Sequence, residues 1–243
     1  MARQTARVLV VGCGGLGCPA AIVLARAGVG VLGLADDDAV ERSNLHRQIL
    51  FDDADVGAPK VEAAARALRV HAPGLEVRMH PTRLLPGNAV ELVSQYDVVV
   101  EGSDNFATKF LTADACLMAG VPVVHAAAVR WLGTVLAVAG TGRPCYRCLF
   151  EDLPLGDAPN CAEAGVVGPV VGIVAAAQAD LALAMIDGLD VAGTLVTFDG
   201  REESYRRRII RARGECPLCG DRRAIRTIEA KRYGDRDPAE CAD

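Results

Sequence analysis

A glycine-rich loop near the N-terminus has the composition and spacing of a phosphate-binding turn. It follows an apolar run at residues 8–11 and precedes an Ala- and Leu-rich segment that reads as a helix. Its glycines are Gly12, Gly14, Gly15 and Gly17. Such glycines let the backbone approach a phosphate, to which the helix N-terminus offers free N–H groups. The alternative is a turn that only allows the helix and the strand to pack closely.

An acidic residue after the next predicted strand extends this motif. Asp36 lies 19 residues beyond Gly17, a spacing suited to binding ribose hydroxyls. Together with the strand and the helix, Asp36 predicts a nucleotide site. The spacing alone does not distinguish among NAD, FAD and ATP.

The polar segment that follows favours ATP over a dinucleotide. Arg47 offers a planar donor fork to phosphate oxygens, and Asn44 adds an amide donor. Lys60 begins the next predicted helix, so its ammonium can reach the same phosphates. Asp104 follows a later predicted strand, at the sheet edge where ligands bind, and is a hard oxygen ligand for Mg²⁺. Each residue alone is more simply a solvated loop residue, and only the set indicates Mg·ATP.

The nine cysteines include two Cys-x-x-Cys pairs, Cys145 with Cys148 and Cys216 with Cys219, separated by 67 residues. Four thiolates complete the tetrahedral shell of a structural Zn²⁺, whereas a single pair would also suit a redox dithiol. Because the count is odd and below the density of a disulfide scaffold, we expect a reducing compartment. Cys161 precedes a predicted helix on an irregular segment, which suits either a thiolate nucleophile or a small buried side chain.

The elements that must position these residues alternate between strand and helix over the first half of the chain. Apolar runs predict strands at 8–11, 29–35, 75–79, 97–101 and 121–126, and helices at 16–27, 60–70, 89–94 and 105–119. This order predicts an α/β fold with a Rossmann-like, doubly wound, mostly parallel sheet. Strands at 132–139, 195–198 and 203–210, with one helix at 170–188, predict a mixed or antiparallel C-terminal part that carries the four-cysteine zinc site.

The overall composition excludes several classes of protein. The net charge of −5, from 26 basic and 31 acidic residues, argues against a nucleic-acid binder. The longest uncharged stretch, residues 164–179, is short for a membrane span and is interrupted by glycines and a proline. No targeting segment is evident, so we expect a cytoplasmic protein that contacts no membrane. We expect one domain over residues 1–220 and a charged, loosely held tail at 221–243.

As a set, these motifs resemble the MoeB/ThiF/HesA family of ATP-dependent activators of ubiquitin-like proteins. The resemblance rests on the glycine loop, Asp36-x-Asp38, Ser43-Asn44-Leu45-His46-Arg47-Gln48, residues 57–61, Asp104-Asn105, both cysteine pairs and residues 161–165. It spans roughly residues 7–220, nearly the whole chain. It implies a ThiF-type adenylation domain with a nucleotide-binding half at 1–129 and a carrier-binding and zinc half at 130–220.

The resemblance also implies a reaction and a set of roles. The enzyme would adenylate the C-terminal glycine carboxylate of a ubiquitin-like sulfur carrier of the ThiS or MoaD kind, releasing pyrophosphate. The cofactors would be ATP, Mg²⁺ and structural Zn²⁺. Catalytic roles would fall to Arg47, Lys60, Asp104 as the Mg²⁺ ligand, and Cys161 through a covalent link with the carrier. The nucleotide site would comprise Gly12, Gly14, Gly15, Gly17, Asp36, Asp38, Ser43, Asn44, Arg47, Gln48, Lys60, Asp104 and Asn105.

The expected partners follow from the same resemblance. Family members form a homodimer in which an arginine of one subunit reaches the ATP of the other, and Arg3, Arg7 and Arg130 are the candidates here. No rhodanese-like extension follows Cys219, so a separate sulfur donor is expected, such as a cysteine desulfurase or a rhodanese. The later sulfur transfer would serve thiamine, molybdopterin or related biosynthesis.

Two alternative functions stay open at this stage. A Rossmann NAD(P)-dependent oxidoreductase is allowed by the glycine loop and Asp36, but Arg47, Lys60 and Asp104 argue against it. A non-catalytic scaffold of the same fold would bind the carrier only, although the chain keeps every residue expected at the ATP site.

Overall fold

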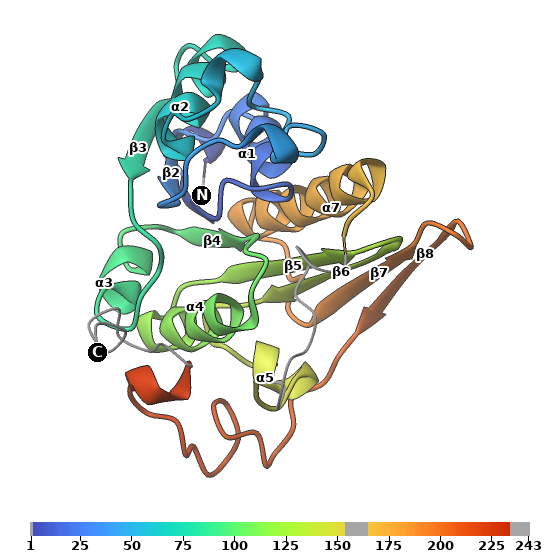
Figure 1. The fold of residues 1–243 in the computed structure, drawn as a ribbon. Helices are drawn as coiled ribbons and strands as arrows, with labels where there is room; N and C mark the ends of the chain where they lie inside the picture. The colour runs from blue at the N-terminus through green and yellow to red at the C-terminus, as the bar shows by residue number, and fades with distance from the viewer. Residues whose placement is uncertain (1, 154–164, 234–243) are drawn as a thin grey trace, which may run out of the picture.

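The fold has three layers, with one sheet between two layers of helices (Figure 1). It is seen in a computed structural model that describes residues 2–153 and 165–233. The eight strands lie in the order β3-β2-β1-β4-β5-β6-β7-β8. Strands β3, β2, β1, β4 and β5 pair in parallel, and β6, β7 and β8 continue the sheet in antiparallel fashion. This confirms the predicted mostly parallel α/β sheet with an antiparallel C-terminal part.

The elements lie close to their predicted positions, although β2 and β5 each begin two residues later than expected and α7 begins and ends two residues earlier. The strands are β1 (Arg7–Val11), β2 (Val31–Ala35), β3 (Glu76–His80), β4 (Val98–Glu101), β5 (Val123–Val129), β6 (Leu132–Val138), β7 (Thr194–Asp199) and β8 (Ser204–Ile209). The helices are α1 (Gly17–Arg26), α2 (Lys60–His71), α3 (Ala89–Val93), α4 (Phe106–Ala119), α5 (Tyr146–Leu149) and α7 (Gly168–Ile186). Short 3₁₀ turns are η1 (Arg3–Thr5), η2 (Arg42–Asn44), η3 (Asp53–Asp55) and η4 (Ala230–Arg232).

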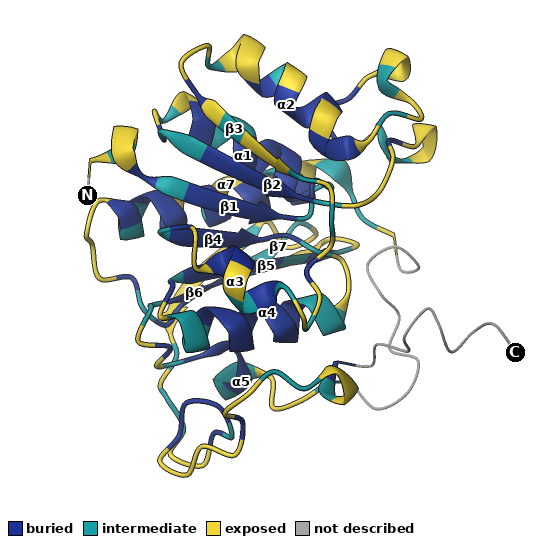
Figure 2. Ribbon diagram, turned by 90° about the vertical axis from the view of Figure 1, so that its left-hand side faces the viewer, coloured by how far each residue is buried: buried dark blue, intermediate teal, exposed yellow. Residues whose placement is uncertain are grey.

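The central parallel strands are buried on both faces, as the dark strands of Figure 2 show. Alternate residues of β1 enter two separate cores: Val8 and Val10 pack on the side of α1, α2 and α7, and Leu9 and Val11 pack on the side of α3 and α4. A strand covered on both faces needs apolar residues at every position. This is why residues 8–11 of β1 and 98–100 of β4 read as apolar runs.

Helix α7 is the one described helix that is long and apolar enough to cross a membrane. Half of its apolar window is buried inside the domain. It packs against α1 and across β4, β5 and β6, and Val170, Val174 and Ala175 belong to the core on that side. The apolar character of α7 is therefore explained by its place in the core.

Helix α4 fixes the loop that precedes it. Its N-cap is Asn105, whose side chain accepts a hydrogen bond from the Thr108 N–H at 2.8 Å. It ends at Gly120, where φ is +70°, a left-handed cap that favours glycine. The helix ends where the sequence predicts and begins one residue later. The cap at Asn105 restrains the polar loop at the end of β4.

The chain after the second cysteine pair packs on the face of α4 and α5. Ile225 and Tyr233 are buried in the core on that side, and the Tyr233 hydroxyl donates to Asp114 Oδ2 at 2.9 Å. Arg147 of α5 binds the same carboxylate through two N–H groups, each at 2.9 Å. The packed region thus extends to Tyr233, beyond the expected boundary at residue 220, because these apolar side chains cover α4.

The buried pair of Asp114 and Arg147 gives a prediction for stability. Their side chains are 0 % and 1 % exposed, so Asp114→Ala removes the buried partner of the Arg147 guanidinium and leaves it the exposed carboxylate of Asp152 at 3.1 Å. We expect the free energy of unfolding to fall by about 3–5 kcal/mol, measured by chemical denaturation. The control is Asp187→Ala, which removes the exposed partner of Arg3. Its denaturation midpoint should match that of the unmodified chain, and an equal loss in both variants would refute the prediction.

Candidate functional site

A cavity of about 370 Å³ opens at the carboxyl ends of the parallel strands β1, β2 and β4. The chain turns from β1 to β2 on one side and returns to β4 on the other, and ligands of such sheets bind at this switch point. The cavity brings together ten of the predicted nucleotide-site residues. They are Gly12, Gly14, Gly15, Asp36, Asp38, Arg47, Gln48, Lys60, Asp104 and Asn105.

The glycine turn forms one wall of this cavity and is fixed by Asp36. Gly12 has φ of +88°, in the left-handed region that favours glycine. The Cys13 N–H donates to Asp36 Oδ2 at 2.7 Å, which joins the turn to the end of β2. Gly17 does not line the cavity; a Cβ there would lie 1.9 Å from the Gly12 carbonyl oxygen. Its glycine is therefore required for close packing of α1 on the turn.

Lys60 presents a cation beside two carboxylates at the cavity wall. Its Nζ lies 2.7 Å from Asp38 Oδ2 and 3.9 Å from Asp36 Oδ1. Burial lowers the pKa of Lys60, but the charge of Asp36 and the hydrogen bond to Asp38 outweigh burial and raise that pKa. Burial likewise raises the pKa of Asp36, against the opposing charge of Lys60. Lys60 is thus a charged ammonium. Its nearer carboxylate partner is Asp38, whose side chain is exposed.

Arg47 supplies the second cation and is held by Asn44. The Arg47 Nη2 donates to Asn44 Oδ1 at 2.7 Å, and the Asn44 amide donates to Glu41. Asn44 and Ser43 do not line the cavity, and the Ser43 hydroxyl donates to Glu41. Beside Arg47, Gln48 is 3 % exposed, and its Oε1 has no hydrogen-bond partner among the described residues. Asn44 therefore orients Arg47, and Gln48, which lines the cavity, has a buried amide oxygen without a partner.

The loop that carries Asp104 is anchored by a buried carboxylate, Glu101, at the end of β4. Glu101 Oε1 accepts from the Ser103 N–H at 2.7 Å and also from the Ser103 hydroxyl. Its Oε2 lies 2.9 Å from Lys109 Nζ and 3.2 Å from His125 Nδ1. Burial raises the pKa of Glu101, but these partners outweigh burial and hold the pKa at about 2. Glu101 is thus ionised and fixes the loop from inside.

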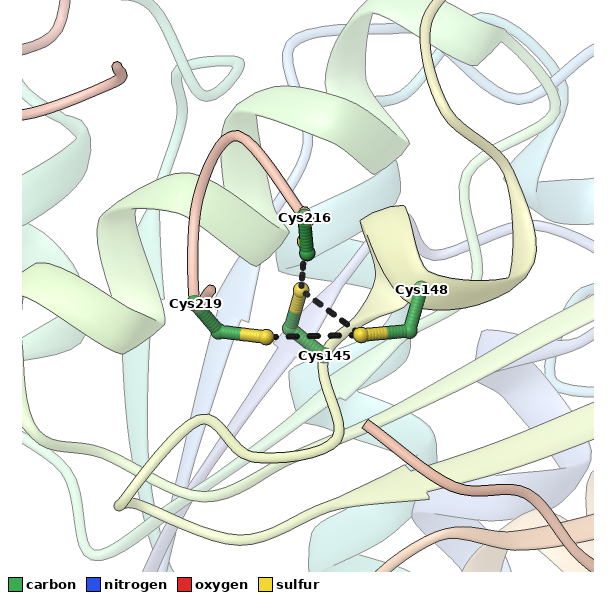
Figure 3. A group of neighbouring side chains, drawn as sticks. All are labelled: Cys145, Cys148, Cys216 and Cys219. Atoms are coloured by element: carbon green, nitrogen blue, oxygen red, sulfur yellow. Dashed lines mark hydrogen bonds between the residues drawn. The ribbon is translucent and has the colours of Figure 1, made fainter. Parts of the chain in front are cut away.

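The four predicted zinc ligands meet beside α5 (Figure 3). The Sγ atoms of Cys145 and Cys216 lie 3.5 Å apart, those of Cys148 and Cys219 3.3 Å, and those of Cys145 and Cys148 3.9 Å. Four sulfurs at about 2.3 Å from a tetrahedral Zn²⁺ would be spaced by about 3.8 Å. The cluster therefore fits one zinc ion, which would join α5 to the segment after β8.

The comparison with protein families supports the same architecture. The model of the ThiF family matches residues 2–219, most of the chain. The chain belongs to the ThiF family. The curated relatives include the adenylyltransferase and sulfurtransferase MOCS3 of Sus scrofa, 44% identical over 93% of this chain. This chain spans only half the length of that relative.

Two relatives match the ThiF domain over most of their own length. The sulfur carrier protein adenylyltransferase of Thermus thermophilus is 42% identical over 90% of this chain and 83% of its own. The SAMP-activating enzyme E1 of Haloferax volcanii is 42% identical over 89% of this chain and 81% of its own. Among solved structures, E. coli MccB has a TM-score of 0.80 at 24% identity, covering 90% of this chain and 66% of that one. That likeness concerns the fold.

The remaining predicted residues of the ThiF domain have other placements. Cys161 lies outside the described residues. Arg3 and Arg7, two candidates for an arginine that serves a partner subunit, form ion pairs within the chain with Asp187 and Asp97. Cys13, Cys18 and Cys116 are buried, and burial raises the thiol pKa of each.

Besides Asp37, the middle residue of the Asp36-x-Asp38 motif, four polar residues of the cavity are not evident from the sequence motifs. They are Arg83, Ser103, Thr108 and Tyr233. Arg83 follows the end of β3 and donates to Asp37 at 2.8 Å, so the strand-end rule that identified Asp36 and Asp104 would also have found it. Tyr233 comes from the C-terminal segment, and no local pattern marks it.

The cysteine geometry predicts about one zinc ion per chain. We expect this content, by elemental analysis, in reduced protein purified without chelator. Cys216→Ala should lose the metal, whereas Cys116→Ala, which removes a buried thiol outside the cluster, should keep it. A zinc content near zero in the unmodified protein would contradict the assignment.

Proposed function

We propose that this ThiF domain adenylates the C-terminal carboxylate of a ubiquitin-like sulfur carrier with Mg·ATP. The observation that carries the proposal is the pair of cations, Arg47 and Lys60, facing one cavity with the glycine turn at the switch point of the sheet. The relatives from Thermus thermophilus and Haloferax volcanii, which match over most of their length, are named as activators of sulfur carriers or SAMP proteins.

The reaction forms one bond and breaks one. A carboxylate oxygen of the carrier attacks the α-phosphorus of ATP, the bond from that phosphorus to the bridging oxygen breaks, and pyrophosphate leaves. A carboxylate is already ionised at neutral pH, so no proton has to be removed. The site needs positioning and charge neutralisation more than a general base, which suits the donors present.

The chain's own residues divide this work. The glycine turn and the start of α1 bind phosphate through backbone N–H groups. Arg47, oriented by Asn44, and Lys60 neutralise phosphate oxygens, and Lys60 exchanges its exposed partner Asp38 for the nucleotide. Asp36 and the unpartnered Gln48 Oε1 accept hydrogen bonds from the nucleoside. With the nucleotide held in this way, the α-phosphorus would lie near Asp104, which lines the same cavity.

Two metals complete the proposal. Mg²⁺ fits beside Asp104, whose carboxylate lines the cavity on a loop fixed by Glu101, and it would neutralise charge on the leaving pyrophosphate. Zn²⁺ fits the four cysteines, where it would stabilise α5. Asp36, Asp37 and Asp38 also lie close together, but Lys60 and Arg83 already pair with Asp38 and Asp37.

The wider context is proposed on the family resemblance. We infer a homodimer, a separate sulfur donor and a cytoplasmic location, and we keep Cys161 as the candidate for a covalent link with the carrier. Arg130 stays a candidate for the arginine that serves a partner subunit. Size-exclusion chromatography with light scattering tests the dimer, and mass spectrometry of the enzyme with carrier and ATP tests Cys161.

ATP–pyrophosphate exchange in the presence of a ThiS-type carrier ending in Gly-Gly tests the proposed reaction. We expect Lys60→Ala and Asp104→Ala each to lower the exchange rate by at least about 100-fold, because each removes charge stabilisation near the reacting phosphate. Matched controls are Lys231→Ala and Asp190→Ala, which lie outside the cavity and should keep the wild-type rate.

The same assay separates the alternatives. Unchanged exchange in the Lys60 and Asp104 variants would refute the assignment of the site. Carrier binding without any exchange in the unmodified protein would favour the non-catalytic scaffold. Quenching of nicotinamide fluorescence, with no exchange, would favour the oxidoreductase.

A further inference from the structure

A second cavity, of about 90 Å³, lies next to the nucleotide cavity. The two cavities share Asp104 and Asn105 in their walls. The other wall residues come from α4, from strands β5, β6 and β7, and from α5 and the residue after it. Beyond the shared pair, the polar members are Lys109, His125, Thr134 and Tyr146, and the others have apolar side chains. The wall is therefore mainly apolar and leads directly to the loop of Asp104.

One buried polar atom in this wall lacks a partner. His125 is 2 % exposed, its Nδ1 faces Glu101, and its Nε2 has no hydrogen-bond partner among the described residues. Tyr146 packs against the imidazole, with ring centroids 4.5 Å apart. A buried polar atom of this kind normally has a partner, so an unpartnered nitrogen in a ring that lines a cavity points to a ligand.

The hydrogen bonds around Glu101 make the unpartnered Nε2 of His125 an acceptor. Glu101 is an ionised acceptor, so the proton of His125 lies on Nδ1 and is donated to Glu101 Oε2. Burial lowers the pKa of His125 despite the opposing charge of Glu101, which keeps the ring neutral. Nε2 therefore carries a lone pair and requires an N–H or O–H donor.

The charges around the cavity restrict what can occupy it. Lys109 Nζ already donates to Glu101 Oε2 at 2.9 Å and to the Ala126 carbonyl at 2.6 Å. An anionic group would thus meet a lone pair on His125 and an ammonium that is already neutralised. A neutral donor with little volume fits better, and a peptide backbone with glycine residues has both properties.

We propose that His125 positions the carrier by accepting a hydrogen bond from a peptide N–H near its C-terminus, which occupies this second cavity. The inference rests on the proposed adenylation, because the carboxylate must then reach the α-phosphorus beside Asp104. Nucleotide binding and carrier binding would thus use different cavities, since the cations Arg47 and Lys60 line only the nucleotide cavity. The 90 Å³ of space selects residues without bulky side chains at this point of the carrier.

A matched pair of variants tests the hydrogen bond. His125→Asn keeps a donor for Glu101 but has no acceptor at the position of Nε2. His125→Gln places an amide oxygen there, and Glu101 then keeps Ser103 and Lys109 as its donors. In carrier-dependent ATP–pyrophosphate exchange, with the ThiS-type carrier ending in Gly-Gly, we expect His125→Asn to raise KM for the carrier about tenfold. KM for ATP should stay unchanged, and His125→Gln should recover most of the loss.

A third variant tests the cavity itself. Ala127→Leu reduces its volume without changing His125, and it should also raise KM for the carrier but not KM for ATP. A role of His125 in folding alone would instead lower thermal stability and change both KM values together. Equal carrier KM in His125→Asn and the unmodified protein overturns the proposal.

A spectroscopic measurement gives an independent readout. The chain has four histidines, so the ¹⁵N signals of His125 can be assigned from the His125→Asn spectrum. We expect a protonated Nδ1 and an unprotonated Nε2 in the free enzyme, and a shift of Nε2 when the Gly-Gly carrier binds. An Nε2 signal unmoved by saturating carrier shows that water alone satisfies this atom and overturns the proposal.

The outcomes separate this inference from the proposed function. If the unmodified enzyme shows no carrier-dependent exchange, the proposed adenylation fails and this inference fails with it. If exchange is normal and the His125 variants behave like the unmodified enzyme, only the positioning role is refuted.

Discussion

The buried carboxylate of Glu101 is the interaction on which the arrangement of the site depends. A charge with no solvent exposure is costly unless donors surround it. Glu101 meets this requirement with donors from three places: the loop at Ser103, helix α4 at Lys109 and strand β5 at His125. Because losing any of these hydrogen bonds would be costly, the loop, α4 and β5 are held in fixed positions relative to one another. The two cavities are lined in part by these elements and are fixed with them.

The backbone carbonyl of Glu101 also bonds to α7, in the helix layer on the other face of the sheet. The Gln178 amide of α7 donates to the Glu101 carbonyl at 2.7 Å and to the Val124 carbonyl at 2.8 Å. Helices on both faces of the sheet are thus connected to the end of β4. The loop of Asp104 is therefore held by the whole three-layer fold, although it is only a few residues long.

The sequence predicted those features whose chemistry is local. Strands covered on both faces show as apolar runs, the glycine loop and Asp36 show by spacing, and zinc ligands show as paired cysteines. Glu101 and His125 were not predicted as a site, because each appears as one polar residue at the end or in the middle of an apolar strand. Their role depends on contacts with Lys109 and Gln178, which meet Glu101 only in the folded chain. Tyr233 was missed for the same reason.

The position of α5 connects the cysteine cluster to the second cavity. Four residues are too few for a helix that is stable alone, so tertiary contacts must hold it. Cys145 and Cys148 hold it on the side of the metal site, and Arg147 holds it to α4 through Asp114. Tyr146 and Leu149 then face the cavity beside His125. A zinc ion held by these four cysteines would thereby help to define the wall that the proposed carrier would contact, although the cysteines themselves do not line either cavity.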